Sequence, residues 1–317
     1  MILSQATLTV ALVALALDAV IGWPDWLYRR IGHPVTWIGR LIAALDLRWN
    51  RGRHLILRGA LAVLVVVLVA VLPALALSAW LMPLPFGPVV LGVLAWPLVA
   101  TRSLYYHVAA VARPLALGDA AAARQAVSMI VGRDLTDDPA PIARAALESL
   151  AENSSDGVVA PILWAAVAGL PGIAAYKAIN TLDSMIGHMS PRHALFGRVA
   201  ARLDDVVNLP ASRLTAALFL LAAPPNKGRA LRVIRRDAGR HRSPNAGWPE
   251  AAMAGALNLR LSGPRSYHGV LSDEPWLNET GRDPDARALG SGLRLYVRAI
   301  SILGLLLAAL LFGQTRF

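Results

Sequence analysis

The sequence predicts an all-α, polytopic membrane protein, and three observations carry this prediction. Of the 317 residues, 56% are hydrophobic and only 16% are charged, a composition too apolar for an ordinary soluble domain. Several apolar runs reach the length of about 20 residues that a helix needs to cross a bilayer. Arginine-rich segments lie between these runs. We therefore expect about four firm transmembrane helices, re-entrant or interfacial helices and cytoplasmic helical loops, all in a single integral membrane domain covering residues 1–317.

The four firm spans are the longest apolar runs of the chain. They cover residues 2–21, 59–82, 89–110 and 293–312. The first run has no basic stretch before it and no small-residue cleavage site after it, so we expect a retained anchor rather than a signal peptide.

The distribution of arginine predicts how the spans are oriented. Residues 22–57, between the first two spans, contain six arginines, and the positive-inside rule places this loop in the cytoplasm. Four spans then put both termini outside and all polar motifs inside. The net charge is +11, and the basic residues lie between the apolar spans. This position favours anionic lipid headgroups over nucleic acid as the partner of these residues. The expected location is the cell (inner) membrane.

Two apolar half-helices surround a predicted break at Leu170-Pro171-Gly172. Residues 158–168 and 173–186 are each too short to span, so we expect a re-entrant hairpin. The alternative is a plain spanning helix over residues 158–176, which would place Lys177 on the outer side. Residues 214–223 are also too short to span alone and are expected to be interfacial or re-entrant.

The remaining segments are expected to form shorter cytoplasmic or interfacial elements. Pro141 begins a predicted helix that ends near Glu152. The break in the helical backbone is expected at Gly157. Residues 263–292 are expected to be rich in loops. Other expected helices cover residues 35–47, 117–131, 226–242 and 251–257.

Polar residues gather between positions 143 and 208, in a chain that is otherwise apolar. Glu148 and Glu152 are four residues apart, so they share one face of a helix. Any one of these residues is more readily explained as a cap, a turn or a solvated face. The whole set is not, because apolar half-helices separate its members and carboxylates near lipid are costly.

The sequence also excludes several kinds of site. There are no cysteines, and therefore no disulfide and no thiolate metal site. Neither a GxxxxGK[ST] loop nor a strand-turn-helix GxGxxG motif is present. The only lysines are Lys177 and Lys227. In an arginine-biased chain, Lys177 within the polar stretch suggests a need for a compact ammonium, with chance as the alternative.

Five blocks of the sequence together resemble the CobD/CbiB family, the membrane proteins of cobalamin biosynthesis called adenosylcobinamide-phosphate synthases. These blocks occur in the family's order over nearly the whole chain. They are GHP with IGR at 32–40, AALESLAEN through DG at 145–157, YK with NTLDSM at 176–185, ARLDD at 201–205 and SPNAGWPE at 243–250. The chain departs from the family pattern before Phe196-Gly197, where it has no tyrosine.

The resemblance implies an amide-forming ligase. Such an enzyme joins the free propionate carboxylate of (adenosyl)cobyric acid to aminopropanol or its phosphate, giving cobinamide or cobinamide phosphate. A carboxylate does not condense with an amine in water near neutral pH, so ATP and Mg²⁺ are the expected cofactors. The expected partners are the corrinoid substrate, aminopropanol or its phosphate, and the lipid bilayer. A homo-oligomer is compatible with the sequence.

The resemblance and the residue chemistry together give candidate site residues. Carboxylates are the ligands that Mg²⁺ prefers, and the candidate ligands are Glu148, Glu152, Asp156, Asp204 and Asp205. The candidate substrate-binding residues are Asn153, Asn180, Asn245, Glu250 and Arg40. The arginine run at 229–242 is an alternative to Arg40 for holding a phosphate.

The candidate catalytic residues are Lys177, Asp183 and His33. Lys177 would stabilise charge on a phosphoryl or acyl oxygen. His33 would act as a base toward the amine, although a role at the start of the helix that follows it is slightly favoured.

Two other functions remain as alternatives. One is a Mg²⁺-dependent membrane transferase acting on a lipid-linked or CDP-linked phosphate substrate, since residues 180–183 and 204–205 loosely resemble its acidic motifs. The matched spacing of that class is absent. The other is a transporter, for which broken helices are natural, but no inverted repeat is found.

Overall fold

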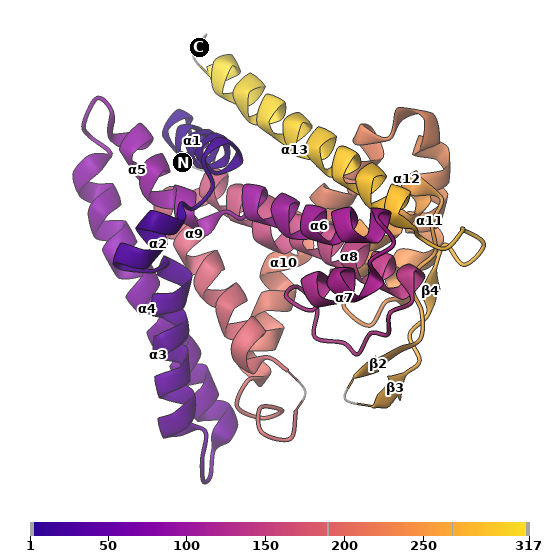
Figure 1. The fold of residues 1–317 in the computed structure, drawn as a ribbon. Helices are drawn as coiled ribbons and strands as arrows, with labels where there is room; N and C mark the ends of the chain where they lie inside the picture. Colours follow the sequence, from indigo (N-terminus) through magenta and orange to yellow (C-terminus); the bar gives the residue numbers. More distant parts are fainter. Residues whose placement is uncertain (1–2, 189, 268, 315–317) are drawn as a thin grey trace. The chain divides into compact units, whose positions relative to one another are not determined.

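The computed structural model describes residues 3–188, 190–267 and 269–314. Within these residues the fold is helical, with two short antiparallel strand pairs (Figure 1). The expected all-α membrane class is confirmed. The described residues divide into two compact units: the first contains the described parts of 1–100, 160–208 and 306–317, and the second contains 101–159 and 209–305. The expectation of a single domain stays a prediction.

The first unit is built around helix α9. This helix contacts α1, α3, α4 and α5, and α3 runs beside α4 (Figure 1). Its core includes Ile42, Val66, Leu182 and Phe196, all nearly inaccessible to solvent. The elements are α1 (Gln5–Val20), α2 (Asp25–Ile31), α3 (Pro34–Trp49), α4 (Leu55–Leu81), α5 (Gly87–Ala95), the 3₁₀ turn Trp96–Leu98, α9 (Ala160–Ile186) and the first part of α10 (Arg198–Ala222).

The two ends of the described chain also meet in the first unit. The side chain of Gln314 donates a hydrogen bond to the carbonyl oxygen of Leu3. Gln314 is the last residue of α13 (Ala286–Gln314), whose earlier part belongs to the second unit.

Helix α9 contains the expected break, at Ala168 and Gly169 rather than at Pro171. The backbone of both residues is non-helical, and Gly169 has a φ of +63°, which glycine adopts without a steric penalty. A Cβ atom on Gly172 would lie 2.2 Å from the carbonyl oxygen of Trp164. In a straight helix, these two residues would be about 12 Å apart along the axis. The chain therefore turns back sharply.

Both limbs of α9 contact the same turn of α10. The indole nitrogen of Trp164 donates to the carbonyl of Val207, at 3.1 Å. The hydroxyl of Tyr176 donates to the side chain of Asn208, at 2.9 Å. These contacts confirm the expected turn and exclude a straight helix over residues 158–176, while its re-entrant placement in the membrane stays a prediction.

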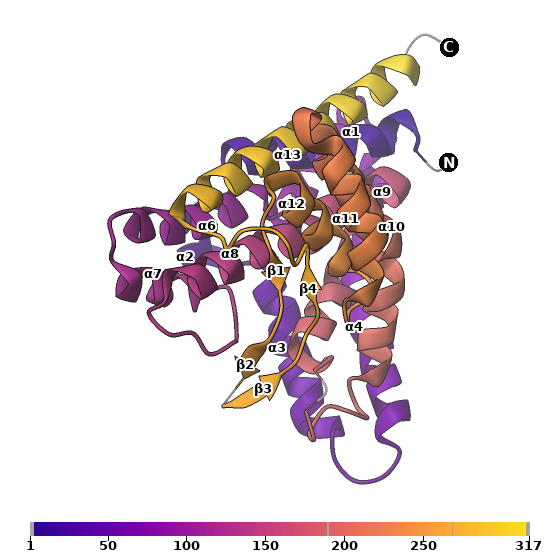
Figure 2. The ribbon, with the colours of Figure 1, turned by 90° about the vertical axis from the view of Figure 1, so that its right-hand side faces the viewer.

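The second unit packs two groups of helices against short strands. Helices α6, α7 and α8 contact one another, α11 contacts α12, and the β1–β4 pair lies beside α12 (Figure 2). Leu147, Leu150, Met253 and Leu289 are fully buried in this unit. Its elements are α6 (Thr101–Ala116), α7 (Ala120–Val127), α8 (Pro139–Asn153), the π-helical turn Ser154–Val159, the end of α10, the 3₁₀ turn Pro224–Asn226, α11 (Lys227–Asp237), the 3₁₀ turn Ala238–Arg240, α12 (Gly247–Leu257), β1 (Leu261–Ser262), β2 (Arg265–Tyr267), β3 (Val270–Ser272), β4 (Trp276–Leu277) and α13.

Five helices in the described chain are long and apolar enough to cross a membrane. They are Leu55–Leu81, Gly87–Ala116, Pro139–Ile186, Arg198–Ala222 and Ala286–Gln314. A sixth arises if Gln5–Val20 and Asp25–Trp49, bent by 113°, form one span. Three of the four expected spans match helices of this set. The first does not stand alone, because α1 has only 16 residues.

Two expected boundaries are wrong. Residues 214–223 are not a short separate helix, because Pro210 lies inside α10, which begins at Arg198 and is 25 residues long. The helix before Gly157 does not break there either. It continues through the π-helical turn into α9. Such turns accommodate an extra residue within a helix and are frequent at functional sites.

Candidate functional site

The structure places the predicted site residues in two separate groups, one in each unit. The first unit contains His33, Arg40, Lys177, Asn180, Asp183, Asp204 and Asp205. The second unit contains Glu148, Glu152, Asn153, Asp156, Asn245 and Glu250. Each group is considered by itself.

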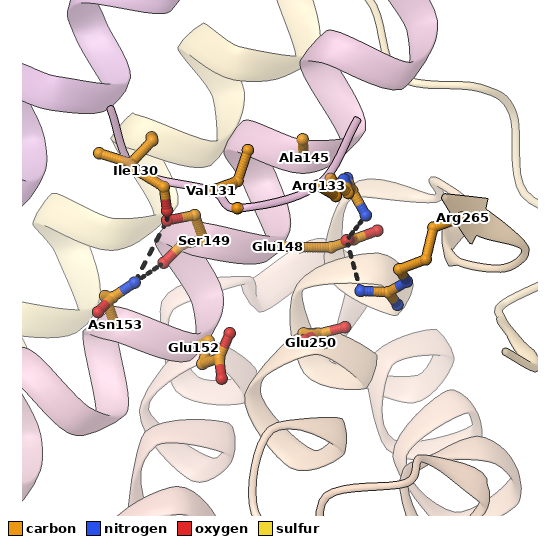
Figure 3. A pocket seen from close by; sticks show the side chains of 11 residues that line it. Ile130, Val131, Arg133, Ala145, Glu148, Ser149, Glu152, Asn153, Glu250 and Arg265 are labelled. Carbon is orange, nitrogen blue, oxygen red and sulfur yellow. Dashed lines mark hydrogen bonds and ion pairs between the residues drawn. The ribbon is translucent and has the colours of Figure 1, made fainter. Parts of the chain in front are cut away.

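The second unit contains a small polar pocket of about 190 Å³ between α8, residues 130–133, α12 and β2 (Figure 3). Helix α8 contributes Glu148 and Glu152 to this pocket, and the two residues share one face of the helix as their spacing predicts. The other charged side chains that line it are Arg133, Glu250 and Arg265. We refer to it below as the α8–α12 pocket.

Glu148 is the most heavily paired carboxylate in the α8–α12 pocket. It is 4% exposed. It accepts a hydrogen bond of 2.7 Å from Arg133 and lies 3.5 Å from a guanidinium nitrogen of Arg265. It also accepts the backbone N–H of Ser262 at 2.6 Å. Two guanidinium groups thus face one carboxylate, so Arg133, Arg265 and Glu148 together carry a net positive charge.

Glu250 lies in the same pocket but is paired differently. It is 2% exposed, and within the described part of the chain its Oε2 atom has no hydrogen-bond partner. Its Oε1 atom lies 3.9 Å from Nε2 of His241. Burial raises the pKa of Glu250 well above its usual value, and the nearby charges of Glu148 and Glu152 raise it further.

The hydrogen bond on the other side of His241 defines its tautomer. The backbone N–H of Ser243 donates to its Nδ1 atom at 3.0 Å. The proton of the neutral imidazole is therefore on Nε2, which faces Glu250. Burial lowers the pKa of His241, followed by the positive charge of Arg265.

Glu152 and Asn153 are exposed and mark the open side of the pocket. In Figure 3 Glu152 lies between Asn153 and Glu250. The amide of Asn153 donates to the backbone and side-chain oxygens of Ser149, at 3.0 and 3.2 Å. Its own side-chain oxygen remains directed away from these bonds as an acceptor.

Asn245 and Asp156 are not among the residues that line this pocket. Asn245 is buried, and its side-chain oxygen accepts from Ser212 at 3.1 Å and from Arg213 at 2.9 Å. Asp156 is half-buried within the π-helical turn.

In the first unit, the second limb of α9 and the start of α10 bring a set of predicted residues together. Asn208 accepts from Tyr176 and donates to Asp204 at 2.9 Å. Asp183 lies near enough to Asp204 and Asp205 for their charges to interact.

Lys177 lies on the same limb of α9, six residues before Asp183. Its ammonium donates to the side-chain oxygen of Asn180 at 3.5 Å, a long hydrogen bond. It is half-buried and close enough to His33 for the two side chains to interact electrostatically.

His33 is the N-cap residue of α3. Its Nδ1 atom accepts the backbone N–H of Val35 at 3.2 Å, and the side chain of Thr36 completes a capping box. This geometry supports the helix-start role over the role of a base. Arg40 is exposed on the same helix. Its assignment to a phosphate, like the assignment of His33 to catalysis, stays a prediction.

Metal binding also stays a prediction. Among the described residues, no group of three or more acidic or histidine side chains is arranged to hold a metal ion. The donor set offers carboxylate oxygens in both units, although those of Glu148 already serve Arg133, Arg265 and Ser262.

Sequence reasoning missed Arg133, Arg265 and His241. Glu148 and Ser262 are separated by 114 residues in the sequence, so no local spacing pattern links this carboxylate to the strand that contacts it. The nearest signal was the presence of acids among apolar half-helices, because a carboxylate in apolar surroundings normally requires a partner.

Comparisons with known proteins agree over the length of the chain. The family model described as CobD/Cbib protein matches residues 11–296. Cobalamin biosynthesis protein CobD of Rhodobacter capsulatus is 60% identical over 291 residues, covering 91% of this chain and 92% of that protein. The proteins of the same name from Rhizobium meliloti and Brucella anthropi are 48% and 45% identical, covering 88% and 98% of this chain and 89% and 98% of their own lengths. No solved structure matches.

Proposed function

This chain belongs to the CobD/Cbib protein family, and from that premise we propose that it acts in cobalamin biosynthesis as an amide-forming ligase of the adenosylcobinamide-phosphate synthase type. It joins the free propionate carboxylate of (adenosyl)cobyric acid to the amine of aminopropanol or its phosphate. The carboxylate carbon forms a bond to the amine nitrogen, and the oxygen leaves on a phosphoryl group supplied by ATP. The chain is embedded in the cell membrane with its polar clusters toward the cytoplasm.

One observation carries this proposal. The segments 145–157 and 243–250, which resemble the family, meet at the α8–α12 pocket through Glu148, Glu152 and Glu250. Glu250 is buried and lies beside two other acids. A helix face that is merely exposed to solvent does not explain this arrangement. The arrangement is therefore better explained by binding than by fold stability alone.

The other polar cluster, in the first unit, offers groups that an activation step needs. Asp183, Asp204 and Asp205 carry oxygen donors of the kind that Mg²⁺ prefers, although no three acidic or histidine side chains of the described residues are arranged as a metal site. Lys177 would stabilise negative charge on the oxygen that develops during transfer.

The proposal is tested by turnover of the purified protein in lipid nanodiscs. Adenosylcobyric acid, ATP, Mg²⁺ and either aminopropanol or its phosphate are supplied, and the amide product is identified by mass spectrometry. The released nucleotide, ADP or AMP, identifies an acyl phosphate or an acyl adenylate as the activated form. Protein that binds the coloured corrinoid but forms no amide with either amine would refute the ligase assignment.

A further inference from the structure

The α8–α12 pocket contains a buried carboxyl group with one oxygen atom left available to a ligand. Glu250 is 2% exposed, and its Oε2 atom, within the described residues, has no hydrogen-bond partner. A buried carboxylate is stable when a positive charge or several hydrogen-bond donors meet it. Its other oxygen is 3.9 Å from His241, too far for a hydrogen bond.

The arginines of the pocket do not meet this requirement. Arg133 and Arg265 are both engaged with Glu148, at 2.7 and 3.5 Å. Their side chains are 7% and 15% exposed, so packing holds them in this arrangement. Their charges act on Glu250 without a hydrogen bond to its Oε2 atom, so a donor that enters the pocket can bind this atom.

The volume of the pocket limits what that donor can be. A pocket of about 190 Å³ is smaller than the roughly 300–1,000 Å³ of sites that enclose a drug-sized ligand, and it is open on one side. It therefore receives a small molecule or one end of a larger one.

The remaining polar groups match an alkylammonium. An ammonium presents N–H donors, and the pocket offers carboxyl oxygens from Glu250 at its base and from Glu152 at its open side. Figure 3 shows Glu152 of α8 beside Glu250 of α12, whereas the amide oxygen of Asn153 points away from both.

We infer that the α8–α12 pocket is a binding site for a small primary amine in its ammonium form, received by Glu250 and Glu152. The identity of the amine rests on the proposed function: it is the amino alcohol that becomes the amide nitrogen, either free or as its phosphate ester. Arg133 and Arg265 position the pocket through Glu148, which leaves Glu152 and Glu250 to receive the ammonium.

The test is a binding measurement on the full chain in nanodiscs, without corrinoid or nucleotide. Titration calorimetry with 1-amino-2-propanol should show binding, and 1,2-propanediol, which carries a hydroxyl in place of the ammonium, should not bind. Glu250→Gln should weaken amine binding about 10- to 100-fold, the range expected for loss of a charged hydrogen bond. Glu279→Gln changes an exposed acid elsewhere in the same unit and should leave binding unchanged.

A second variant keeps the inference testable if Glu250→Gln does not fold. Glu152→Gln lies on the open side, where a loss of folding is not expected, and should weaken binding several-fold. Comparing the free amino alcohol with its phosphate ester reveals whether Arg133 and Arg265 add to affinity. Competition by Mg²⁺ for the same carboxylates would overturn the inference by assigning the pocket to a metal.

The outcome is separable from that of the proposed function. Turnover that is normal, together with amine binding that neither Glu→Gln variant changes, would overturn the amine site and leave the ligase assignment standing. Charge-dependent amine binding without any amide product would overturn the ligase assignment and leave the amine site standing.

Discussion

Two chemically identical substitutions in the α8–α12 pocket should differ in their effect on the free energy of unfolding. Glu148→Gln removes the carboxylate that Arg133, Arg265 and the backbone of Ser262 share. It leaves two nearly buried guanidinium groups without their anion. Breaking a buried pair in this way costs about 3–5 kcal/mol of unfolding free energy.

Glu250→Gln should not carry this penalty. Its Oε2 atom has no hydrogen-bond partner in the described residues, so the substitution removes a desolvated carboxyl group without leaving a cation behind. The free energy of unfolding at pH 7 should stay the same or increase.

The two variants are compared by thermal and denaturant unfolding in nanodiscs, followed by intrinsic tryptophan fluorescence. Glu279→Gln provides the baseline for an exposed acid. Replacing both Arg133 and Arg265 by Met in the Glu148→Gln background should recover part of the lost stability, because no unpaired charge then remains. Equal destabilisation by Glu148→Gln and Glu250→Gln would refute the distinction between a paired and an unpaired carboxylate.

Four further outcomes are expected. Because burial raises the pKa of Glu250 in the folded state, stability should be greatest below its unfolded pKa of about 4.3 and fall as pH rises toward the folded value; Glu250→Gln should remove this slope in melting experiments. Lys177→Arg and Lys177→Ala should each lose about 10²–10³ in turnover with corrinoid binding kept, whereas full activity in Lys177→Arg would identify a lysine that only reaches toward the lipid headgroups. Gly172→Ala should destabilise the α9 hairpin, since its Cβ would meet the Trp164 carbonyl at 2.2 Å, and a melting temperature equal to that of the unmodified chain would contradict the sharp turn. Topology reporters should be cytoplasmic in the arginine-rich loop 22–57 and periplasmic at both ends of the chain; a cytoplasmic C-terminus would favour an odd number of spans.

The sequence predicted the elements whose cause is local. The apolar run of α4 and the spacing of Glu148 and Glu152 both follow from composition and helical period, and both are confirmed. The α9 hairpin was predicted because two half-length apolar helices surround Pro171.

The errors occurred where distant contacts override local preference. Residues 214–223 were expected to be a short segment of their own, but they continue α10, which remains helical on both sides of Pro210. Gly157 was expected to break a helix and instead lies in the π-helical turn. Arg265 reaches Glu148 only through the tertiary fold, so no sequence pattern could have paired them.

The meeting of Leu3 and Gln314 has a consequence for biogenesis. The first unit contains residues from both ends of the chain, so it cannot be completed until the last turns of α13 leave the ribosome. The early apolar helices therefore remain in the bilayer as a partial assembly until α13 is synthesised. Folding of the unit is expected to be slow, because its contacts join distant parts of the sequence.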